Sequence, residues 1–591
     1  MQRFPLLPLE EEGRLNDLPL RENFIERVFR SRERREGAYY RWTEMLKSDP
    51  TPGDLVRLHT AHKLTLMAHP CPVGRAGSTA LPEARPPGRL GRHPAAGGAA
   101  CLHLTDLASG YILQALESCR TICKTSCTGL PYMEPVFDYI DSSRHSFIDR
   151  LIDYLRHPSI SAYGIGMDEV ADYLLTWLTK LGFDAQLLTT PGWPLVLGRR
   201  FDQPAAPTVL LYGHYDVQPP EPLDEWISPP FEPTIRSGRL YARGVGDNKG
   251  QHFAQILALE SLLAVHGQLP CNVIVLLEGE EEVGSPHIAD FVRTHRELLQ
   301  ADLVITSDGP VAENGRPTIE FGVRGVVSFE LRARGAKRDL HSGNYGGIAP
   351  NPLWTLVHLL GTMKNSRGEI TVEGFYDNVQ PPTELERAAL ARLPVDERTV
   401  KRDLGIDHFD APHDRPYFER LACWPTLTIN GLHGGYGGPG PKTVLPHEAF
   451  AKCDIRLVEA QTVKEILAKL EAHVRRHAPG VEFIRQGGMD PSKTPLDSPY
   501  VEPLRQGIVT AQGEEPLMIP AMGGSLPDYV FTKILGIPDF TVPYANADEA
   551  NHAPNENLEL ERFIRGIKTS AAMLTFLGQM QTATTHAAAP T

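Results

Sequence analysis

The sequence predicts an α/β protein in which a largely parallel, helix-covered sheet is interrupted by a smaller inserted α+β domain. Between residues 183 and 306, short β-rich apolar runs alternate with segments of helical periodicity, which is typical of a parallel sheet with helices on its faces. Between residues 325 and 485 the order changes to β-α-β-β-α-β, the order of a ferredoxin-like module. From residue 499 to 576 the first pattern returns, so we expect the smaller domain to lie inside the larger one.

Length and composition predict a multidomain globular protein. The chain has 591 residues, too many for one ordinary core, of which 41% are apolar and 22% charged. Its net charge of −14 argues against a nucleic-acid partner, because binding to a phosphate backbone depends on clustered Lys and Arg. No apolar run approaches the roughly 20 residues that cross a bilayer, so we expect no membrane partner.

The start of the chain and its cysteines predict a cytoplasmic location. The first residues lack the apolar core of a secretory signal. The eight cysteines form no paired framework suited to a secreted domain, so we interpret them as free thiols. Cys119, Cys123 and Cys127 lie four residues apart, a spacing that matches no familiar zinc motif.

Residues 1–133 are predicted to be an N-terminal extension that is partly disordered. Residues 14–46 could form charged helices, whereas residues 69–100 are rich in Pro, Gly, Ala and Arg and contain few core-forming side chains. Met133 directly precedes a regular pattern. We therefore interpret the upstream part as an appendage or as an artefact of start-site choice.

Residues 134–322 are predicted to be the first part of a catalytic domain. Helices are expected at 137–156 and 168–181, the second capped by Asp168, and again at 250–266 and 285–299. Strands are expected at 183–188, 194–198, 208–212, 272–277 and 302–306.

Residues 323–490 are predicted to be the inserted lid or dimerisation domain. The expected elements are strands at 325–334, 426–432, 450–457 and 481–485, with helices at 352–363 and 462–477. A long polar insertion separates residues 366 and 425. Residues 491–580 should complete the catalytic domain, and residues 581–591 should form a flexible tail.

Side chains that bind metals follow the predicted strands of the larger domain. In an open α/β sheet, residues that directly follow parallel strands converge at one edge. The residues in question are His214 and Asp216, Glu281 and Glu282, Asp308 and His552, each after a strand, with Asp247 where a helix begins. Singly, each is more often a turn, a cap or a solvated residue. Together, without Arg or Lys nearby, the carboxylates would repel one another unless cations offset their charge.

Two divalent ions fit this set better than one. Two ions close together need a bridging carboxylate, and Asp247 is central in sequence between the other ligands. Mixed imidazole and carboxylate donors suit zinc, and also manganese or cobalt. Asp216 lies two residues beyond His214 and can accept the other imidazole N–H, which would fix the orientation of the ring.

One carboxylate must stay free of the metals to move protons. The adjacent Glu281 and Glu282 allow this division, because one can bind while its neighbour acts as the base. From the residues alone Glu280 remains a rival.

Five motifs together resemble the M20 family of di-metal peptidases, and most closely its carnosinase-like cytosolic dipeptidases. They are GHYDVQP at 213–219, RGVGDNKG at 243–250, EEVGS at 281–285, SD at 307–308 and DLHSG at 339–343. The resemblance covers roughly residues 134–577. Tyr215 and Asn248 depart from the residues usual at those positions.

The resemblance implies specific roles for the metal-binding residues. One metal would be held by His214, Asp247 and Asp308, and the other by Asp247, Glu282 and His552. Glu281 would then be the general base, which leaves Glu280 outside the site. The resemblance also implies a cis peptide between Asp247 and Asn248.

The resemblance further implies substrate-binding residues and a homodimer. His341 would reach the active site of the partner subunit and stabilise the oxyanion there, so dimerisation through the inserted domain is expected. Arg456, Thr443 and the segment Gly523, Gly524 and Ser525 match positions that hold the carboxylate of the substrate. A guanidinium with backbone N–H groups is chemically suited to that anion.

The sequence thus predicts a metal-dependent hydrolase that cleaves dipeptides or small peptides with a free carboxylate. Glu281 would move the proton, and His341 with the metals would stabilise the oxyanion. An alternative on the same scaffold is a deacylase of N-acyl amino acids. A catalytically silent binding protein is a second alternative, but it predicts the loss of a ligand or base, and every expected position is filled.

Overall fold

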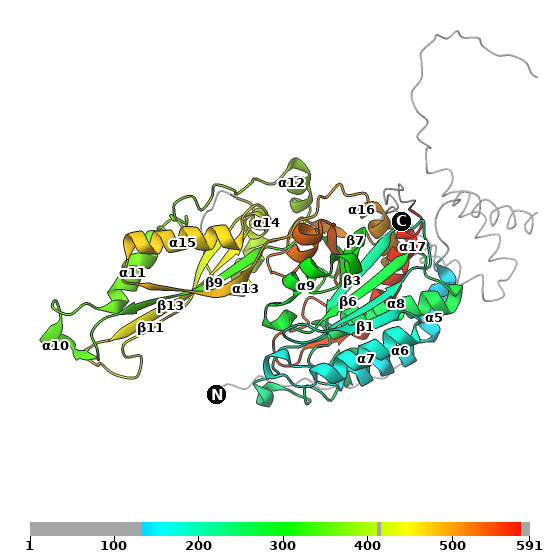
Figure 1. Ribbon diagram of the computed structural model, residues 1–591, viewed down its shortest axis with the longest axis horizontal. Coiled ribbons are helices and arrows are strands. Elements are labelled where there is room, and N and C mark those ends of the chain that lie inside the picture. Colours follow the sequence, from blue (N-terminus) through cyan, green and yellow to red (C-terminus); the bar gives the residue numbers. More distant parts are fainter. Residues whose placement is uncertain (1–132, 411–414, 581–591) are drawn as a thin grey trace, which may run out of the picture. The chain divides into compact units, whose positions relative to one another are not determined.

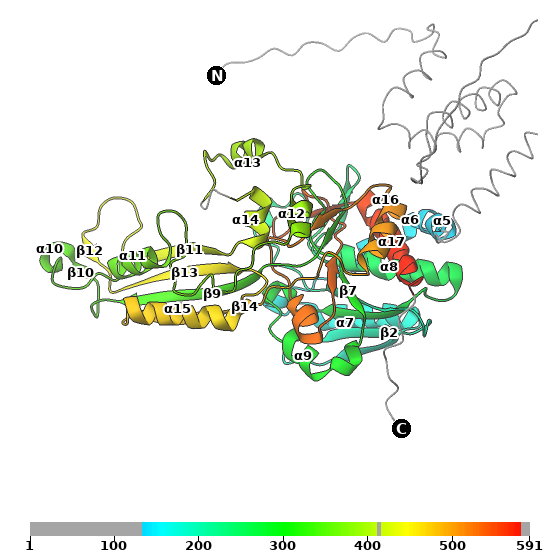
Figure 2. The same cartoon turned by 90° about the horizontal axis from the view of Figure 1, so that it is seen from above.

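The computed structural model describes residues 133–410 and 415–580, which contain two large sheets, each with its own helices, and two small ones (Figures 1 and 2). The predictions made for residues 1–132, including the three spaced cysteines, and for residues 581–591 lie outside the described residues. No helix in the described part of the chain is long and apolar enough to span a membrane.

The first sheet has eight strands and is largely parallel, as predicted. In spatial order the strands are β1 (Asp184–Leu188), β2 (Leu195–Arg200), β6 (Asn272–Glu278), β3 (Thr208–His214), β7 (Leu303–Thr306), β16 (Asp539–Thr541), β8 (Thr318–Glu320) and β15 (Leu517–Ile519). Strand β3 is parallel to both of its neighbours, β6 and β7. The three strands therefore end at the same edge of the sheet.

Strand β3 is apolar along most of its length because both faces of the sheet are covered. Val209 and Leu211 pack into a core with the helices on one face, whereas Leu210 and Tyr212 pack into a second core on the other. A strand buried on both faces needs apolar residues at every position. This explains why the sequence shows a continuous apolar run there.

Helices cover this sheet on both sides. One core includes residues of α5 (Glu134–Ser142), α6 (Arg144–Leu155), α7 (Met167–Lys180), α8 (Lys249–His266), α16 (Val501–Gln512) and α17 (Leu560–Leu577). The other includes α9 (Ile288–Thr294) and the π-helix η6 (Val530–Leu535). A small sheet of β17 (Asn557–Glu559), β5 (Arg239–Tyr241) and β4 (Thr234–Arg236) lies apart from the large one.

Three helix predictions are wrong in detail. The helix expected at 137–156 is divided between α5 and α6 at Ser143. Asp168 does not cap α7, because Gly166 occupies the N-cap in a left-handed conformation with φ 71°. The helix expected at 285–299 is shorter, since α9 ends at Thr294 and a 3-10 helix follows.

The second sheet has four antiparallel strands and two helices, which matches the predicted ferredoxin-like order. Its strands are β11 (Thr426–Gly434), β13 (Glu448–Leu457), β9 (Gly325–Arg334) and β14 (Glu482–Met489), in that spatial order. Alternate residues of β9, from Val327 to Ala333, pack with α11 (Pro352–Met363) and α15 (Val463–His477). Strand β10 (Leu340–His341) pairs with β12 (Val444–Leu445) in a short ribbon, and the one-turn helix α10 (Ser342–Tyr345) directly follows β10.

The polar insertion of the second sheet folds into three short helices and reaches the first sheet. They are α12 (Glu384–Leu390), α13 (Glu397–Leu404) and α14 (Tyr417–Cys423). Leu390, Leu393 and Ala422 pack in one apolar cluster with Leu517 of β15, the last strand of the first sheet. The chain itself crosses between the sheets twice, and the two crossings are hydrogen-bonded, with Ser492 N donating to Val323 O at 3.1 Å.

Candidate metal centre

The predicted metal ligands meet at the edge of the large sheet where parallel strands end. His214 is the last residue of β3, Asp308 follows β7, and Glu282 lies in the short helix η4 (Glu281–Val283) after β6. Asp247 lies in the loop before α8, and His552 lies between β16 and β17. The topology therefore brings residues from five distant segments to one place.

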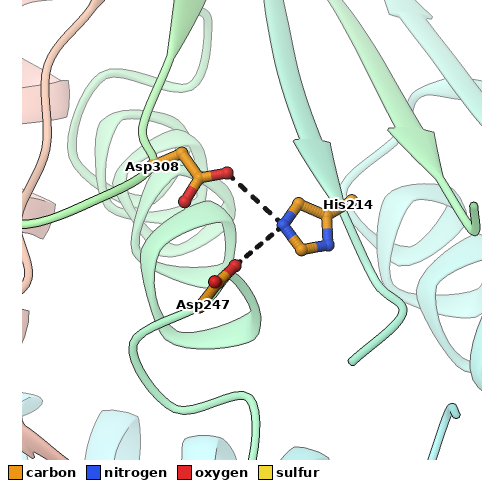
Figure 3. Close-up of side chains that lie close together, drawn as sticks. All are labelled: His214, Asp247 and Asp308. Carbon is orange, nitrogen blue, oxygen red and sulfur yellow. Dashed lines mark hydrogen bonds and ion pairs between the residues drawn. The ribbon is translucent and has the colours of Figure 1, made fainter. Parts of the chain in front are cut away.

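The first group of donors surrounds the ring of His214. Its Nε2 atom lies 3.1 Å from Asp247 Oδ1 and 3.3 Å from Asp308 Oδ2 (Figure 3). His214 is fully buried, and both carboxylates are buried as well. An imidazole and two carboxylates in this arrangement are donors that suit zinc and similar divalent ions.

The second group shares Asp247 with the first. Asp247 Oδ2 lies 3.0 Å from His552 Nε2, and the same ring nitrogen lies 3.2 Å from Glu282 Oε2. Each oxygen of Asp247 thus faces a different histidine. The ligand atoms within each group lie within 4.8 Å of one another. This is the arrangement expected of a carboxylate that bridges two ions.

The electrostatics of the site indicate a shortage of positive charge. Burial and the neighbouring Asp247 raise the pKa of Glu282 to about 7 and also raise the pKa of Asp308. Hydrogen bonds to Asp247 and Glu282 raise the pKa of His552, whose side chain is 54% exposed, to about 11. Burial lowers the pKa of His214, but its hydrogen bonds to Asp216, Asp247 and Asp308 outweigh that effect and raise it. Despite burial, hydrogen bonds to the two histidines lower the pKa of Asp247, whereas Glu282 and Asp308 are harder to ionise than usual, so the donor set fits a divalent metal pair that would offset the carboxylate charge.

Asp216 connects the histidine to the two glutamates. His214 Nδ1 lies 3.3 Å from Asp216 Oδ1 and 3.1 Å from its backbone oxygen. The same carboxylate accepts the backbone N–H of Glu281 at 3.2 Å and that of Glu282 at 3.1 Å. Asp216 therefore fixes both the imidazole and the segment that carries the glutamates.

Glu281 and Glu280 have different surroundings. Burial raises the pKa of Glu281 well above its ordinary value; nearby His214 lowers it, and the carboxylates of Glu282, Asp308 and Asp247 raise it further. Glu280 instead lies 2.8 Å from His287 Nδ1. A Cβ at Gly192 would come within 1.8 Å of Glu280 Oε1, so this side chain packs against the 190–194 loop. The geometry separates Glu280 from the donors.

Three residues around the ligands were not singled out from the sequence. Gln218 Nε2 donates to Glu282 Oε2 at 2.8 Å, and Asn248 Nδ2 donates to Ser307 O at 2.6 Å beside Asp308. Glu556 accepts the backbone N–H of Asp247 at 3.1 Å. Gln218 and Asn248 lie inside the recognised motifs, which is a usable signal, whereas the sequence around Glu556 offers none.

The expectation that no Lys or Arg lies near the site needs correction. Lys249 is fully buried two residues after Asp247, and burial lowers its pKa to about 7. Its Nζ donates to His157 O at 2.6 Å and lies 4.8 Å from the Tyr154 ring. The ammonium group is therefore directed away from the ligand carboxylates and does not neutralise them.

The backbone at the site is unusual. The peptide between Asp247 and Asn248 is cis, as predicted. His552 has a φ of 55° and Ser285, after the glutamates, has a φ of 50°, a region that L-residues rarely adopt. Such conformations persist where the surrounding structure enforces them, and they are common at functional sites.

The expected substrate-binding residues form two groups. Arg456 Nη1 donates to Ser525 Oγ at 2.7 Å, and Gly523 O accepts both Nε and Nη2 of Arg324 at 3.0 and 2.8 Å. Gly524 lies between them with open space where a Cβ would be. These residues connect the inserted domain to the loop after β15.

His341 and Thr443 form the second group, on the ribbon of the inserted domain. His341 Nε2 lies 3.3 Å from Thr443 Oγ1, and its Nδ1 accepts Gly343 N at 3.0 Å. Both residues are exposed, and α10, which begins just after His341, lies at the end of the inserted sheet away from the large sheet (Figures 1 and 2). Within one chain these two residues do not join the metal ligands.

Comparison with known proteins gives consistent results. Residues 210–575 match the model of Peptidase family M20/M25/M40. The Cys-Gly metallodipeptidase dug1 of Schizosaccharomyces pombe is 30% identical over 461 residues, covering 74% of this chain and 96% of its own. The Beta-Ala-His dipeptidase of Homo sapiens is 30% identical, covering 76% and 93%. The crystal structure of the M20 family metallo-carboxypeptidase Sso-CP2 from Sulfolobus solfataricus is 35% identical, with a TM-score of 0.70, covering 73% and 99%.

Proposed function

This chain belongs to Peptidase family M20/M25/M40, and from that premise we propose that it hydrolyses the peptide bond of dipeptides and other small peptides with a free carboxyl terminus. The observation that carries the proposal is the pair of donor groups that share Asp247, with Glu281 beside them. The names of the relatives support a dipeptide substrate.

We propose that His214, Asp247 and Asp308 hold one divalent ion and that Asp247, Glu282 and His552 hold a second. Zinc suits two imidazoles with three carboxylates, and manganese or cobalt is compatible with the same donors. When bound, such ions polarise a carbonyl and lower the pKa of water. The acid-rich donors described above support this assignment, and His214, Asp247 and Asp308 among them are buried.

Glu281 is proposed as the general base. It stands next to the ligand Glu282, and Asp216 holds the backbone N–H groups of both. A carboxylate with a raised pKa is a stronger base than usual, so it can take a proton from the attacking water and deliver it to the leaving amine. Asp216 is proposed as a positioning residue, because it orients both the His214 ring and the backbone of Glu281 and Glu282.

Arg456, with Ser525 and the backbone of Gly523 and Gly524, is proposed to bind the carboxylate of the substrate. The guanidinium already meets the Ser525 hydroxyl at 2.7 Å, and its side chain is 33% exposed. A planar guanidinium beside backbone N–H groups is suited to a carboxylate. This anchor favours substrates that keep a free carboxyl group.

His341 and Thr443 are proposed to act across a homodimer. Strand β11 is at the edge of the inserted sheet, and several apolar side chains on it and on α11 are exposed, with Trp354 at 60%, Ile429 at 51% and Leu432 at 42%. Exposed apolar side chains next to an open strand edge indicate an interface. We propose that a second copy of this chain covers them, so that His341 of the partner subunit completes the active site and stabilises the oxyanion.

We also propose a cytoplasmic location. In the described part of the chain Cys271, Cys423 and Cys453 are free, as expected in a reducing compartment. The net charge of −14 gives no reason to propose a nucleic-acid partner.

The decisive experiment is a substrate panel with controlled metal content. The protein is stripped with a chelator, reloaded with zinc, manganese or cobalt, and assayed on dipeptides, tripeptides and N-acetyl amino acids. We expect metal-dependent cleavage of dipeptides. Preferred turnover of N-acetyl amino acids would instead favour a deacylase, and efficient trimming of longer peptides would favour a carboxypeptidase such as the Sulfolobus relative.

Glu281→Gln and Glu280→Gln form a matched pair of variants for the base. We expect Glu281→Gln to lower kcat by about 10²–10⁴-fold with metal content unchanged, and Glu280→Gln to retain most activity. Full activity in Glu281→Gln, or no metal-dependent turnover in the unmodified protein, would rule out the proposed mechanism.

A further inference from the structure

Glu556 lies behind the metal centre, beneath the loop that carries Asp247. It is fully buried, four residues after His552 and directly before β17. Each of its carboxylate oxygens accepts two hydrogen bonds. Oε2 accepts Arg243 Nη1 at 2.8 Å and Gly244 N at 2.9 Å, and Oε1 accepts Gly246 N at 2.8 Å and Asp247 N at 3.1 Å.

The loop at 243–247 is shaped around this carboxylate. Gly244 has a φ of 83°, a conformation that favours glycine, and a Cβ at Gly246 would come within 2.2 Å of Glu549 Oε2. Gly244 therefore allows the turn in which the N–H groups of Gly244, Gly246 and Asp247 face one carboxylate, and Gly246 leaves room for Glu549. This is a backbone anion site whose occupant is supplied by the chain itself.

Arg243 balances the charge of Glu556. The guanidinium is 1% exposed, donates to Pro219 O at 3.3 Å as well as to Glu556, and lies 5.4 Å from the Trp226 ring. A buried carboxylate held by a guanidinium and three N–H groups is fully hydrogen-bonded. It can therefore fix the loop without adding unbalanced negative charge next to Asp247.

The same side chain connects two distant ligand segments. His552 lies four residues before Glu556, and β17 is paired with β5, so Asn557 faces Tyr241 just before the Asp247 loop. Asp247 must direct one oxygen at His214 and the other at His552, at 3.1 and 3.0 Å. A shift of its backbone would disturb both groups of donors together.

We propose that Glu556, with Arg243, is a positioning residue that sets the geometry of the bridging ligand Asp247 before any metal binds. This inference rests on the proposed di-metal function. Because Glu556 touches neither substrate nor ligand atoms of the site, its contribution is to metal affinity and, through it, to catalysis. Partners of metal ligands typically contribute about 10–100-fold to metal affinity.

The matched variants are Glu556→Gln and Glu559→Gln in the full-length protein. Both make the same chemical change near the same strand, but the Glu559 carboxylate pairs with Arg239 at 3.0 Å and with Arg562 at 3.1 Å. The carboxamide introduced by Glu556→Gln would place an NH₂ group against backbone donors and lose at least two of the four bonds. Zinc affinity is measured on metal-stripped protein by competition with a chromophoric chelator, alongside the melting temperature of the metal-free form.

We expect Glu556→Gln to weaken zinc binding by about 10–100-fold and Glu559→Gln to change it less than about threefold. If Glu556→Gln lowers the metal-free melting temperature but binds two equivalents of zinc as tightly as the unmodified protein, Glu556 is a structural residue only and the proposal is wrong. If the unmodified protein binds no divalent ion, the proposed function fails instead.

Amide hydrogen exchange on the unmodified, metal-free protein tests the proposal even if Glu556→Gln does not fold. We expect the amides of Gly244, Gly246 and Asp247 to exchange slowly without metal, because Glu556 holds them. We expect Glu556→Asp, which shortens the side chain by one methylene, to speed their exchange. Exchange of these amides at unprotected rates in the unmodified metal-free protein would overturn the proposal.

Discussion

The metal centre and the outer end of the inserted domain use the same residue type, histidine, in opposite surroundings. His214 is fully buried and faces two carboxylates of its own chain at 3.1 and 3.3 Å. His341 is exposed, and its ring meets only a backbone N–H and a threonine hydroxyl of its own ribbon in the described structure. The geometry of the candidate metal ligands can therefore be judged from one chain, whereas the role proposed for His341 requires a second copy.

The largest effect is expected from Asp247→Asn. Replacing the shared carboxylate removes charge from both groups of donors, so we expect loss of both metals. The fall in kcat/KM should be well beyond the roughly 10–100-fold loss of activity that is typical when a residue that only hydrogen-bonds to a metal ligand is replaced. Metal content by elemental analysis and kcat/KM on a dipeptide measure the two losses. Retention of two tightly bound metals would show that Asp247 is not shared.

A mixing experiment tests whether His341 acts from the partner subunit. We expect His341→Ala to lower kcat by about 10²–10³-fold with metal content unchanged, as for loss of an oxyanion donor. Mixing inactive His341→Ala and Glu281→Ala subunits should restore activity, because hybrid dimers contain one site with both residues intact. If the mixture stays inactive although subunit exchange is confirmed by native mass spectrometry, His341 does not act across the interface.

Metal binding at the candidate centre should depend on pH. Burial and Asp247 raise the pKa of Glu282 to about 7, so lowering the pH through this value adds a proton to Glu282 that the metal must displace. Affinity should therefore fall as the pH is lowered from 8 to 6, by about tenfold per unit for each proton released. Calorimetry in buffers of different ionisation enthalpy counts those protons, and a count of zero would contradict this picture.

The smallest effect is expected from Arg334→Ala at the end of β9. Its side chain is 67% exposed, and its ion pairs with Glu448 and Glu482 are long, at 3.6 and 3.7 Å. Exposed pairs of this kind contribute about 0–1 kcal/mol to the free energy of unfolding. Denaturant unfolding should show little change, and kcat/KM should match the unmodified protein.

The convergence of the candidate ligands could be predicted from the order of apolar strands and polar side chains in the sequence. Apolar strands with polar side chains directly after them mark one edge of a parallel sheet, and His214, Asp308 and Glu282 all follow such strands. The choice between Glu280 and Glu281 as base came from the family resemblance. The interaction of Glu280 with His287 depends on how the loop folds, and no sequence rule provides that.

Two helix starts show local signals that the sequence analysis misjudged or missed. Asp168 was expected to cap α7, but Gly166 takes that place and leaves Asp168 in the first turn, where it still faces the positive end of the helix. The insertion was expected only to be polar. Yet Thr383 and Glu386 form a capping box at the start of α12, a local signal of a helix that the sequence offered.

The apolar cluster between the insertion and β15 has a consequence for motion. Two hydrogen-bonded crossings would by themselves act as a hinge between the sheets, free to swing as peptides enter and products leave. Leu390, Leu393 and Ala422 add a third attachment on Leu517, away from those crossings. If the two sheets move relative to each other, either the cluster is exposed to water or the insertion helices stay with the first sheet. In the second case the backbone must bend at the ends of the insertion as well as at the two crossings.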